Sequence, residues 1–298
     1  MRAGLRLAGR GAAGMLPLFL SGCFLISTTR KLPVPKAPQL VQSVAPEELV
    51  NRLNQRWSTL DTLTAKVEIQ ASVLHSTIGV VKDYTTIPGI ILMRKPEMLR
   101  VYGRVPVIGT ELFDMVSDGK NFTLFIPSKS KAIQGSNALE KKSANQLENM
   151  RPGFFLDALG VRGLDPDDRY SVSSDVSTEE DVAKKHLFIE PEYVLSIHRP
   201  KTGSQEDTPL RVVTFHRDDM LPHQQDIYDS KGNLETQIYY EQYGDFGPNR
   251  YPTKVTIKRP IDEIQIILTI ENVTENMKLK DDQFEIQLPP ETQVQKLE

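Results

Sequence analysis

LTAKVEIQASV, residues 63–73, alternates apolar and polar side chains without a break. Successive side chains of a β-strand point to opposite faces, so this pattern predicts a strand with one buried and one wet face. The same pattern recurs in short runs that begin near Ile87, Met98, Glu111, Phe122, His186, Tyr193, Leu210, Gln224, Leu234, Lys254, Glu263 and Phe284. Turn signals such as Asp118-Gly119 separate them, and parallel pairs would need crossover helices between consecutive strands. The runs therefore predict a mainly β (α+β) protein with an antiparallel sheet.

Helical periodicity is confined to two places. Pro46 to Thr59 starts with proline and two acids and carries Leu49, Leu53 and Trp57 at helical spacing, which predicts an amphipathic helix. RPGFFLDALG, residues 151–160, has a proline at its start and a glycine stop around an apolar centre, which predicts a short helix packed on the sheet. The polar stretch from Leu164 to Lys185 is expected to be a loop or an edge hairpin.

The N-terminus has the layout of a signal peptide, with three arginines, no acid and a short apolar stretch from Ala12 to Leu20. That stretch is shorter than the about 20 residues of a membrane-spanning helix. LSGC, residues 20–23, resembles a bacterial lipobox, and this resemblance implies that the mature chain begins at an acylated Cys23. The alternative is an ordinary secretory signal with an incidental cysteine. No aspartate follows the cysteine, which favours the outer membrane over the inner membrane.

Three segments are expected: a lipoprotein signal peptide in residues 1–22, the acylated cysteine with a proline-rich tether in 23–45, and one folded domain in 46–298. The tether has prolines at 33, 35 and 38 and no hydrophobic period. Such segments extend by about 3.1 Å per residue, so the domain can stand away from its anchor.

Composition and motifs exclude several function classes. The 298 residues carry 36 basic and 39 acidic groups, which gives no basic field for nucleic acid. A single cysteine permits no intramolecular disulfide and no cysteine zinc cluster. The five histidines lack HxH or HExxH spacing, and no nucleotide-binding or nucleophile-elbow motif occurs, so we expect neither a metal, a cofactor nor catalytic residues.

A family resemblance rests on the order of several motifs. MLRVY, residues 98–102, followed by VPVIGTEL, residues 105–112, resembles the LolB type of outer-membrane lipoprotein receptor, in which a Pro-Leu-Gly loop precedes a Thr-Glu-Leu strand. Residues 151–160 resemble that family's short internal helix. VTEN at 273–276 and KDDQFEIQLP at 280–289 look more like the end of the LolA-type carriers. The similarity to the LolA/LolB family covers residues 46–293, and the chain departs from it by the longer segments Ser76 to Tyr84 and Leu164 to Lys185.

The resemblance implies an open antiparallel β-barrel of about eleven strands, with helices plugging the concave side and an apolar cavity for acyl chains. Trp57, Leu53, Phe154 and Phe155 are the expected cavity residues, although Trp57 could equally serve plain core packing. Val105, Val107 and Ile108 are expected to form a membrane-insertion loop, the alternative being that they fold back under the sheet.

The expected function is that of a lipid-anchored protein on the periplasmic face of the bacterial outer membrane. It would bind acyl chains or lipoproteins, receive them from a periplasmic carrier protein, and assist their transfer or insertion without covalent chemistry. The alternative is a structural or assembly lipoprotein that holds a protein partner on the same sheet.

Overall fold

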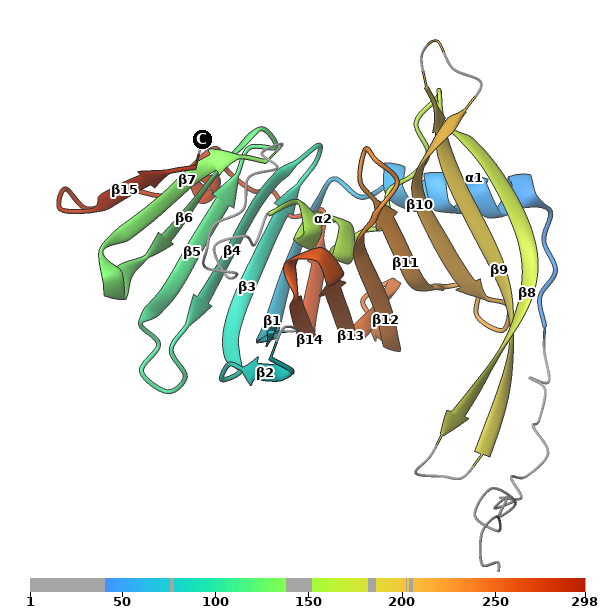
Figure 1. Cartoon of the computed structure of the whole chain (residues 1–298), viewed down its shortest axis with the longest axis horizontal. Helices are drawn as coiled ribbons and strands as arrows, with labels where there is room; N and C mark the ends of the chain where they lie inside the picture. The colour runs from blue at the N-terminus through green and yellow to red at the C-terminus, as the bar shows by residue number, and fades with distance from the viewer. Residues whose placement is uncertain are drawn as a thin grey trace, which may run out of the picture.

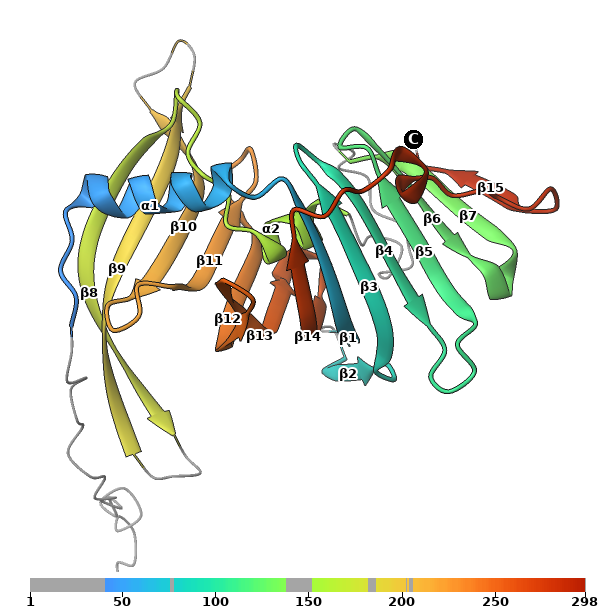
Figure 2. The same cartoon turned by 180° about the vertical axis from the view of Figure 1, so that it is seen from behind.

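A computed structural model of the chain describes residues 41–75, 78–137, 152–181, 186–201, 203 and 206–297. The expected signal peptide, Cys23 and most of the tether lie outside these residues. The described residues form one large open sheet with two α-helices, α1 (Pro46–Ser58) and α2 (Gly153–Leu159) (Figures 1 and 2). Neither helix is long and apolar enough to cross a bilayer.

Fifteen strands make up this sheet. They are β1 (Thr62–His75), β2 (Val80–Asp83), β3 (Ile87–Arg94), β4 (Met98–Arg104), β5 (Glu111–Ser117), β6 (Asn121–Ile126), β7 (Lys131–Ser136), β8 (Arg169–Asp181), β9 (His186–Pro200), β10 (Asp207–His216), β11 (Pro222–Tyr228), β12 (Leu234–Phe246), β13 (Asn249–Arg259), β14 (Ile264–Glu275) and β15 (Gln293–Lys296). Short 3₁₀ turns, η1 (Pro127–Lys129), η3 (Pro260–Asp262) and η4 (Asp281–Phe284), interrupt them.

The strand order is two antiparallel meanders joined edge to edge. β3 to β7 follow one another on one side of β1, and β8 to β14 follow one another on the other side, with β1 paired to β14. β15 adds to β7 in parallel, and β2 pairs only with the end of β1. The sheet remains open between β8 and β15, as the family resemblance implied.

Two sequence predictions about strands were wrong. The strand count is fifteen rather than about eleven, in part because the segment from Leu164 to Lys185 contributes β8, a 13-residue edge strand, and the segment from Ser76 to Tyr84 contributes β2. The strand expected from Phe284 to Leu288 does not form. Phe284 instead ends η4, with its side chain buried and the Arg94 guanidinium carbon 4.9 Å from its ring centroid.

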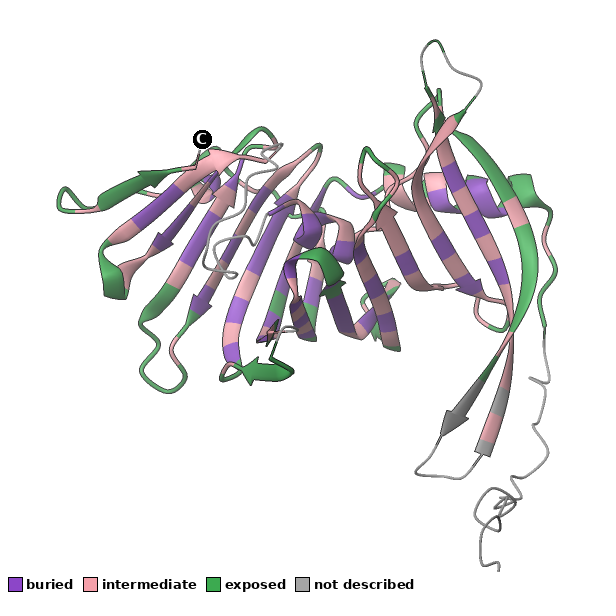
Figure 3. Ribbon diagram, in the orientation of Figure 1, coloured by how far each residue is buried: buried purple, intermediate pink, exposed green. Residues whose placement is uncertain are grey.

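The register places one apolar face along the whole sheet. In the β8 to β14 half, cross-strand neighbours on this inner face are Leu195, Val213, Gln225, Ile238, Ile257 and Ile266. In the other half they are Ala65, Ile91, Val101, Met115, Leu124 and Ile133. Nearly all of these side chains are fully buried, and Figure 3 shows the resulting alternation of buried and exposed positions along the strands. The buried face predicted from residues 63–73 is confirmed.

Both helices pack on this inner face but belong to different apolar clusters. The first cluster joins Leu49, Val50 and Leu53 of α1 to side chains of β9 and β10, such as Leu195 and Phe215. The second joins the apolar side of α2 to β1, β3 to β7 and β12 to β14. The two cores meet near β11, whose pairing is irregular with β10 and again with β12. At this boundary the inner face carries a polar residue, Gln225, whose side-chain amide donates to the Asp157 carbonyl.

Candidate functional site

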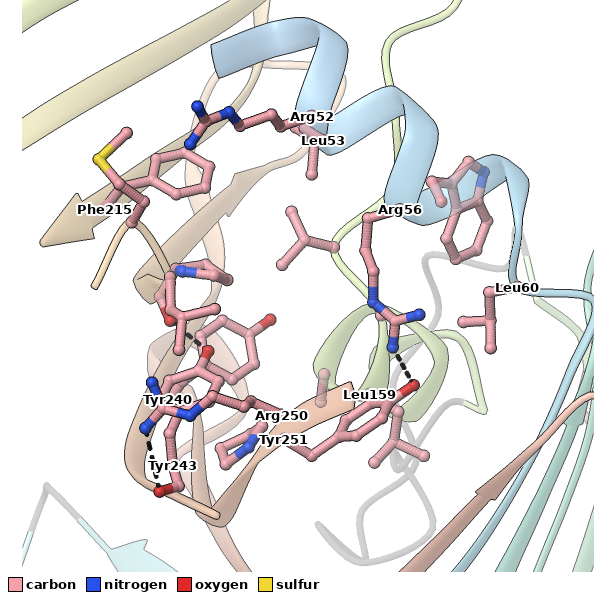
Figure 4. A pocket seen from close by; sticks show the side chains of 18 of the residues that line it. Arg52, Leu53, Arg56, Leu60, Leu159, Phe215, Tyr240, Tyr243, Arg250 and Tyr251 are labelled. Atoms are coloured by element: carbon pink, nitrogen blue, oxygen red, sulfur yellow. Dashed lines mark hydrogen bonds between the residues drawn. The ribbon is translucent and has the colours of Figure 1, made fainter. Parts of the chain in front are cut away.

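A cavity of about 250 Å³ lies where the two cores meet, between α1, the end of α2, the β10–β11 turn and the β12–β13 hairpin (Figure 4). Most of its wall is aliphatic or aromatic. The lining residues are Leu49, Arg52, Leu53, Arg56, Trp57, Leu60, Ala158, Leu159, Gly160, Val161, Phe215, Met220, Leu221, Pro222, Tyr240, Tyr243, Arg250, Tyr251, Pro252 and Ile270. An apolar cavity with a few polar groups is the usual form of a small-molecule site.

Three arginines and no carboxylate contribute to this wall. Figure 4 shows Arg52 reaching from α1 toward Phe215, Arg56 reaching toward Tyr251, and Arg250 lying beside Tyr243. Each arginine has an acidic partner outside the lining: exposed Glu48 lies 2.8 Å from Arg52, exposed Asp245 lies 3.7 Å from Arg250, and the largely buried Glu275 pairs with Arg56. The apolar space therefore has a cationic rim.

Arg56 also ties α1 to the sheet. Its guanidinium donates to the Tyr251 hydroxyl and to Glu275, and Tyr251 donates to the same carboxylate. Asn249 donates to the second oxygen of Glu275 at 2.7 Å. Because the Glu275 side chain is only 15% exposed, this charge-assisted network holds one wall of the cavity in place.

Two tyrosines present their rings to the cavity and their hydroxyls to the backbone. Tyr240 donates to the Asp157 carbonyl at 3.2 Å, and Tyr243 donates to the Pro222 carbonyl. Burial raises the pKa of both phenols above the ordinary range, and Asp157 reinforces this for Tyr240. Both therefore stay neutral, which suits a wall that contacts apolar groups.

The expected cavity residues divide into two groups. Leu53 and Trp57 line the cavity, whereas Phe154 and Phe155 are buried in the core between α2 and the sheet and do not line it. Trp57 also lines a polar cleft on its other side, where the Lys95 ammonium lies 4.8 Å from its ring centroid. The α2 residues that line the cavity, Ala158 and Leu159, come one turn later than the phenylalanines.

The expected insertion loop stands at the opposite edge of the sheet. Val107 is fully exposed and Ile108 is 74% exposed, while Val105 is half-buried. The loop is a tight turn in which the Gly109 amide donates to the Val105 carbonyl at 2.8 Å, and Val107 takes a positive φ of 68°. The two tip side chains thus point into solvent rather than under the sheet.

A cluster of potential metal ligands lies on the outer face of the sheet. Ligand atoms of Glu190, His216 and Asp218 lie within 4.8 Å of one another. Burial, together with the stacked His223 ring at 3.5 Å, lowers the pKa of His216 to about 4. The sequence offered no signal for this group, because Glu190 comes from β9 and the other two from the end of β10 and its turn.

No family model matches the chain, and no curated protein matches it in sequence. Solved structures match it in shape. A LolA superfamily protein from Nitrosomonas europaea is 15% identical over 82% of this chain and 99% of its own, with a TM-score of 0.50. The fold is LolA/LolB-like.

Two further structures agree with this assignment at the same TM-score of 0.50. An outer membrane lipoprotein-sorting protein domain from Vibrio parahaemolyticus is 12% identical over 80% of this chain and 94% of its own. A DUF1329 family protein from Desulfovibrio piger is 16% identical over 80% of this chain and 95% of its own. At these identities the likeness establishes the LolA/LolB-like fold alone.

Proposed function

We propose that this chain is a cell-envelope lipoprotein that binds acyl chains in the LolA/LolB-like cavity and hands them to a membrane. The apolar cavity under α1 and α2 is the observation that supports this most directly. An acyl chain exposed to water costs about 0.8 kcal/mol per methylene, so a carrier needs a sheltered apolar space of this kind. No covalent step is part of the proposal.

The arginine rim adds a preference for the ligand's head group. Arg52, Arg56 and Arg250 surround the apolar space, and no acid lines it. A phosphate or carboxylate at the end of an acyl chain would meet guanidinium groups at the rim while the chain fills the interior. The proposed ligand is therefore an anionic amphiphile, such as an acidic lipid.

Anchoring and delivery complete the proposal. A lipid on Cys23 would hold the protein on the periplasmic face of the outer membrane, and the tether would let the domain meet a periplasmic carrier protein that supplies the ligand. The exposed tip formed by Val107 and Ile108 would enter the bilayer during delivery, because an isolated aliphatic tip gains free energy only when it leaves water.

Trp57 makes the cavity measurable, since it is the only tryptophan in the chain and lines the cavity. We expect a fatty acid to shift or quench its emission saturably, and a fatty alcohol of equal length to bind more weakly. Leu53→Asn should weaken this binding, whereas the matched control Leu74→Asn, at an exposed leucine outside the cavity, should not.

The proposal fails if no amphiphile changes Trp57 emission at any concentration below its micelle point. Mass spectrometry of the organic extract of the purified protein identifies the natural ligand independently of the added probe.

A further inference from the structure

The hairpin formed by β1 and β2 exposes aliphatic side chains where a soluble hairpin normally carries polar ones. Leu74, Ile78, Val80 and Val81 are between 42% and 69% exposed. All four residues of β2 are exposed, and β2 pairs only with the end of β1. Neither the cavity nor its rim accounts for this surface.

The antiparallel register brings this hairpin to the same edge of the sheet as two other turns. Ile87 at the start of β3 pairs with Ile69, Gly103 near the end of β4 pairs with Gly89, and Ile264 at the start of β14 pairs with Val73. The β1–β2 hairpin, the β4–β5 loop and the β13–β14 turn therefore share one edge. Figures 1 and 2 both show β2 and the β4–β5 loop along this edge.

Exposed apolar side chains concentrate on this edge. Of the thirteen large apolar residues that are exposed in the described part of the chain, eight lie on these three turns and the strand ends beside them. They are Leu74, Ile78, Val80, Val81, Val107, Ile108, Leu112 and Ile261. Monomeric proteins rarely gather exposed apolar side chains in this way unless the patch contacts another phase or partner.

The β1–β2 hairpin and the β4–β5 loop each have a tyrosine with a basic side chain over its ring. The Lys82 ammonium lies 4.9 Å from the ring centroid of Tyr84, and the Arg104 guanidinium carbon lies 5.4 Å from that of Tyr102. Tyrosine and basic residues are the side chains that proteins place at the level of lipid head groups. The edge thus combines aliphatic side chains at its turns with tyrosines and basic side chains on the adjoining strands.

The acids near these tyrosines and basic side chains each face other groups of the protein. Asp83 accepts a hydrogen bond from the Ser72 hydroxyl at 2.6 Å, and Glu111 is the backbone partner of Arg104 in the β4–β5 ladder and lies in the field of Arg100 and Arg104. Lys82 and Arg104 remain exposed beside the tips. They are therefore placed to contact anionic lipid head groups.

We propose that this edge docks on a bilayer and that the β1–β2 hairpin is a second membrane-contacting element beside the β4–β5 loop. Only the role of the β4–β5 loop rests on the proposed function; the hairpin's role stands on its own exposure and position. A protein partner fits less well, because protein interfaces are anchored by aromatic side chains in pockets, and no exposed aromatic residue is described on this edge.

Vesicle flotation tests this with the chain from Val41 onward, which contains every described helix and strand and lacks Cys23. The probes are phosphatidylcholine vesicles, alone or mixed with phosphatidylglycerol. We expect the wild type to float, more strongly with the anionic lipid. Ile78→Asp with Val81→Asp should weaken flotation about tenfold or more, because two aliphatic side chains no longer enter the lipid.

A matched control carries the same two added charges on exposed valines elsewhere. The double variant Val176→Asp with Val294→Asp, on β8 and β15, should float like the wild type. The fragment contains no cysteine, so Ile78→Cys labelled with an environment-sensitive dye should also report a blue shift on adding vesicles. Unchanged melting temperatures would show that the hairpin variants fold.

Three results would overturn the docking edge. They are a wild-type chain that does not float, hairpin variants that float like the wild type, and a control variant that loses flotation as much as the hairpin variants. A Trp57 titration on the same samples separates this failure from failure of the proposed lipid carriage, because the cavity lies at the other edge of the sheet.

Discussion

Replacing Leu159 by tryptophan tests the size of the cavity and its role in binding. Leu159 lines the cavity from the end of α2, while Leu156, one turn earlier on the same helix, is buried in the core and does not line it. The substitution adds about 60 Å³, the liquid volume of two waters. The cavity of about 250 Å³ is about four times that volume.

The magnitude follows from the cost of empty space in a core, about 24 cal/mol per Å³. Filling about 60 Å³ should leave the free energy of unfolding of Leu159→Trp unchanged or raise it by up to about 1.5 kcal/mol. The same change at Leu156 overpacks a filled core and should cost about 1–3 kcal/mol. Fatty-acid binding should be lost in Leu159→Trp, because the indole occupies the acyl site.

Urea denaturation followed by circular dichroism measures both free energies, and displacement of a fluorescent fatty acid measures binding. The reasoning is refuted if Leu159→Trp is destabilised as much as Leu156→Trp, since the space would then be absent. It is also refuted if Leu159→Trp binds fatty acid as tightly as the wild type.

Four further outcomes are expected. Val107→Glu with Ile108→Glu should leave the free energy of unfolding within about 0.5 kcal/mol, because both side chains are exposed, yet stop transfer of lipid to liposomes; a fall in melting temperature would contradict this. In urea denaturation, Glu275→Gln should lower the free energy of unfolding by about 1 kcal/mol, because Arg56 loses its charged partner. The control Asp245→Asn, at an exposed ion pair, should leave it almost unchanged. The pKa of His216 is about 4 in the folded protein and about 6.5 in the unfolded chain. Its contribution to the free energy of unfolding is therefore present near pH 7 and is lost as the pH falls, by about 2 kcal/mol at pH 5. The free energy of unfolding of His216→Gln should fall by about that much less between pH 7 and pH 5. Cys23→Ala should abolish incorporation of labelled lipid, and unchanged labelling would disprove the anchor.

The sequence predicted what local periodicity controls. The strict alternation of residues 63–73 predicted β1 and its buried face, and Pro46 with Glu47 and Glu48 predicted the start of α1. Both patterns can be recognised in a short stretch of sequence, because each element buries one face and this alone sets the spacing of its apolar residues.

The remaining features depend on pairing rather than on periodicity. The segment from Leu164 to Lys185 was expected to be a loop or an edge hairpin, and β8 forms such a hairpin with β9; its serines and acids are typical of an edge strand. Phe284 alternates with polar residues as a strand residue would, yet it packs under Arg94 on the outer face. The arginine rim could not be predicted from the sequence either, because only the folded sheet brings Arg250 close to the helix that carries Arg52 and Arg56.

The irregular pairing on both sides of β11 has a mechanical consequence. Each half of the sheet has its own apolar cluster, but α1 spans both of them. Its first residues pack on β9 and β10, and Arg56 in its last turn binds Tyr251 and Glu275 of the other half. β11 is the short strand between the two halves, and its ladder is interrupted toward each of them. We therefore expect α1, rather than the pairing of β11, to fix the spacing between the two sides of the cavity.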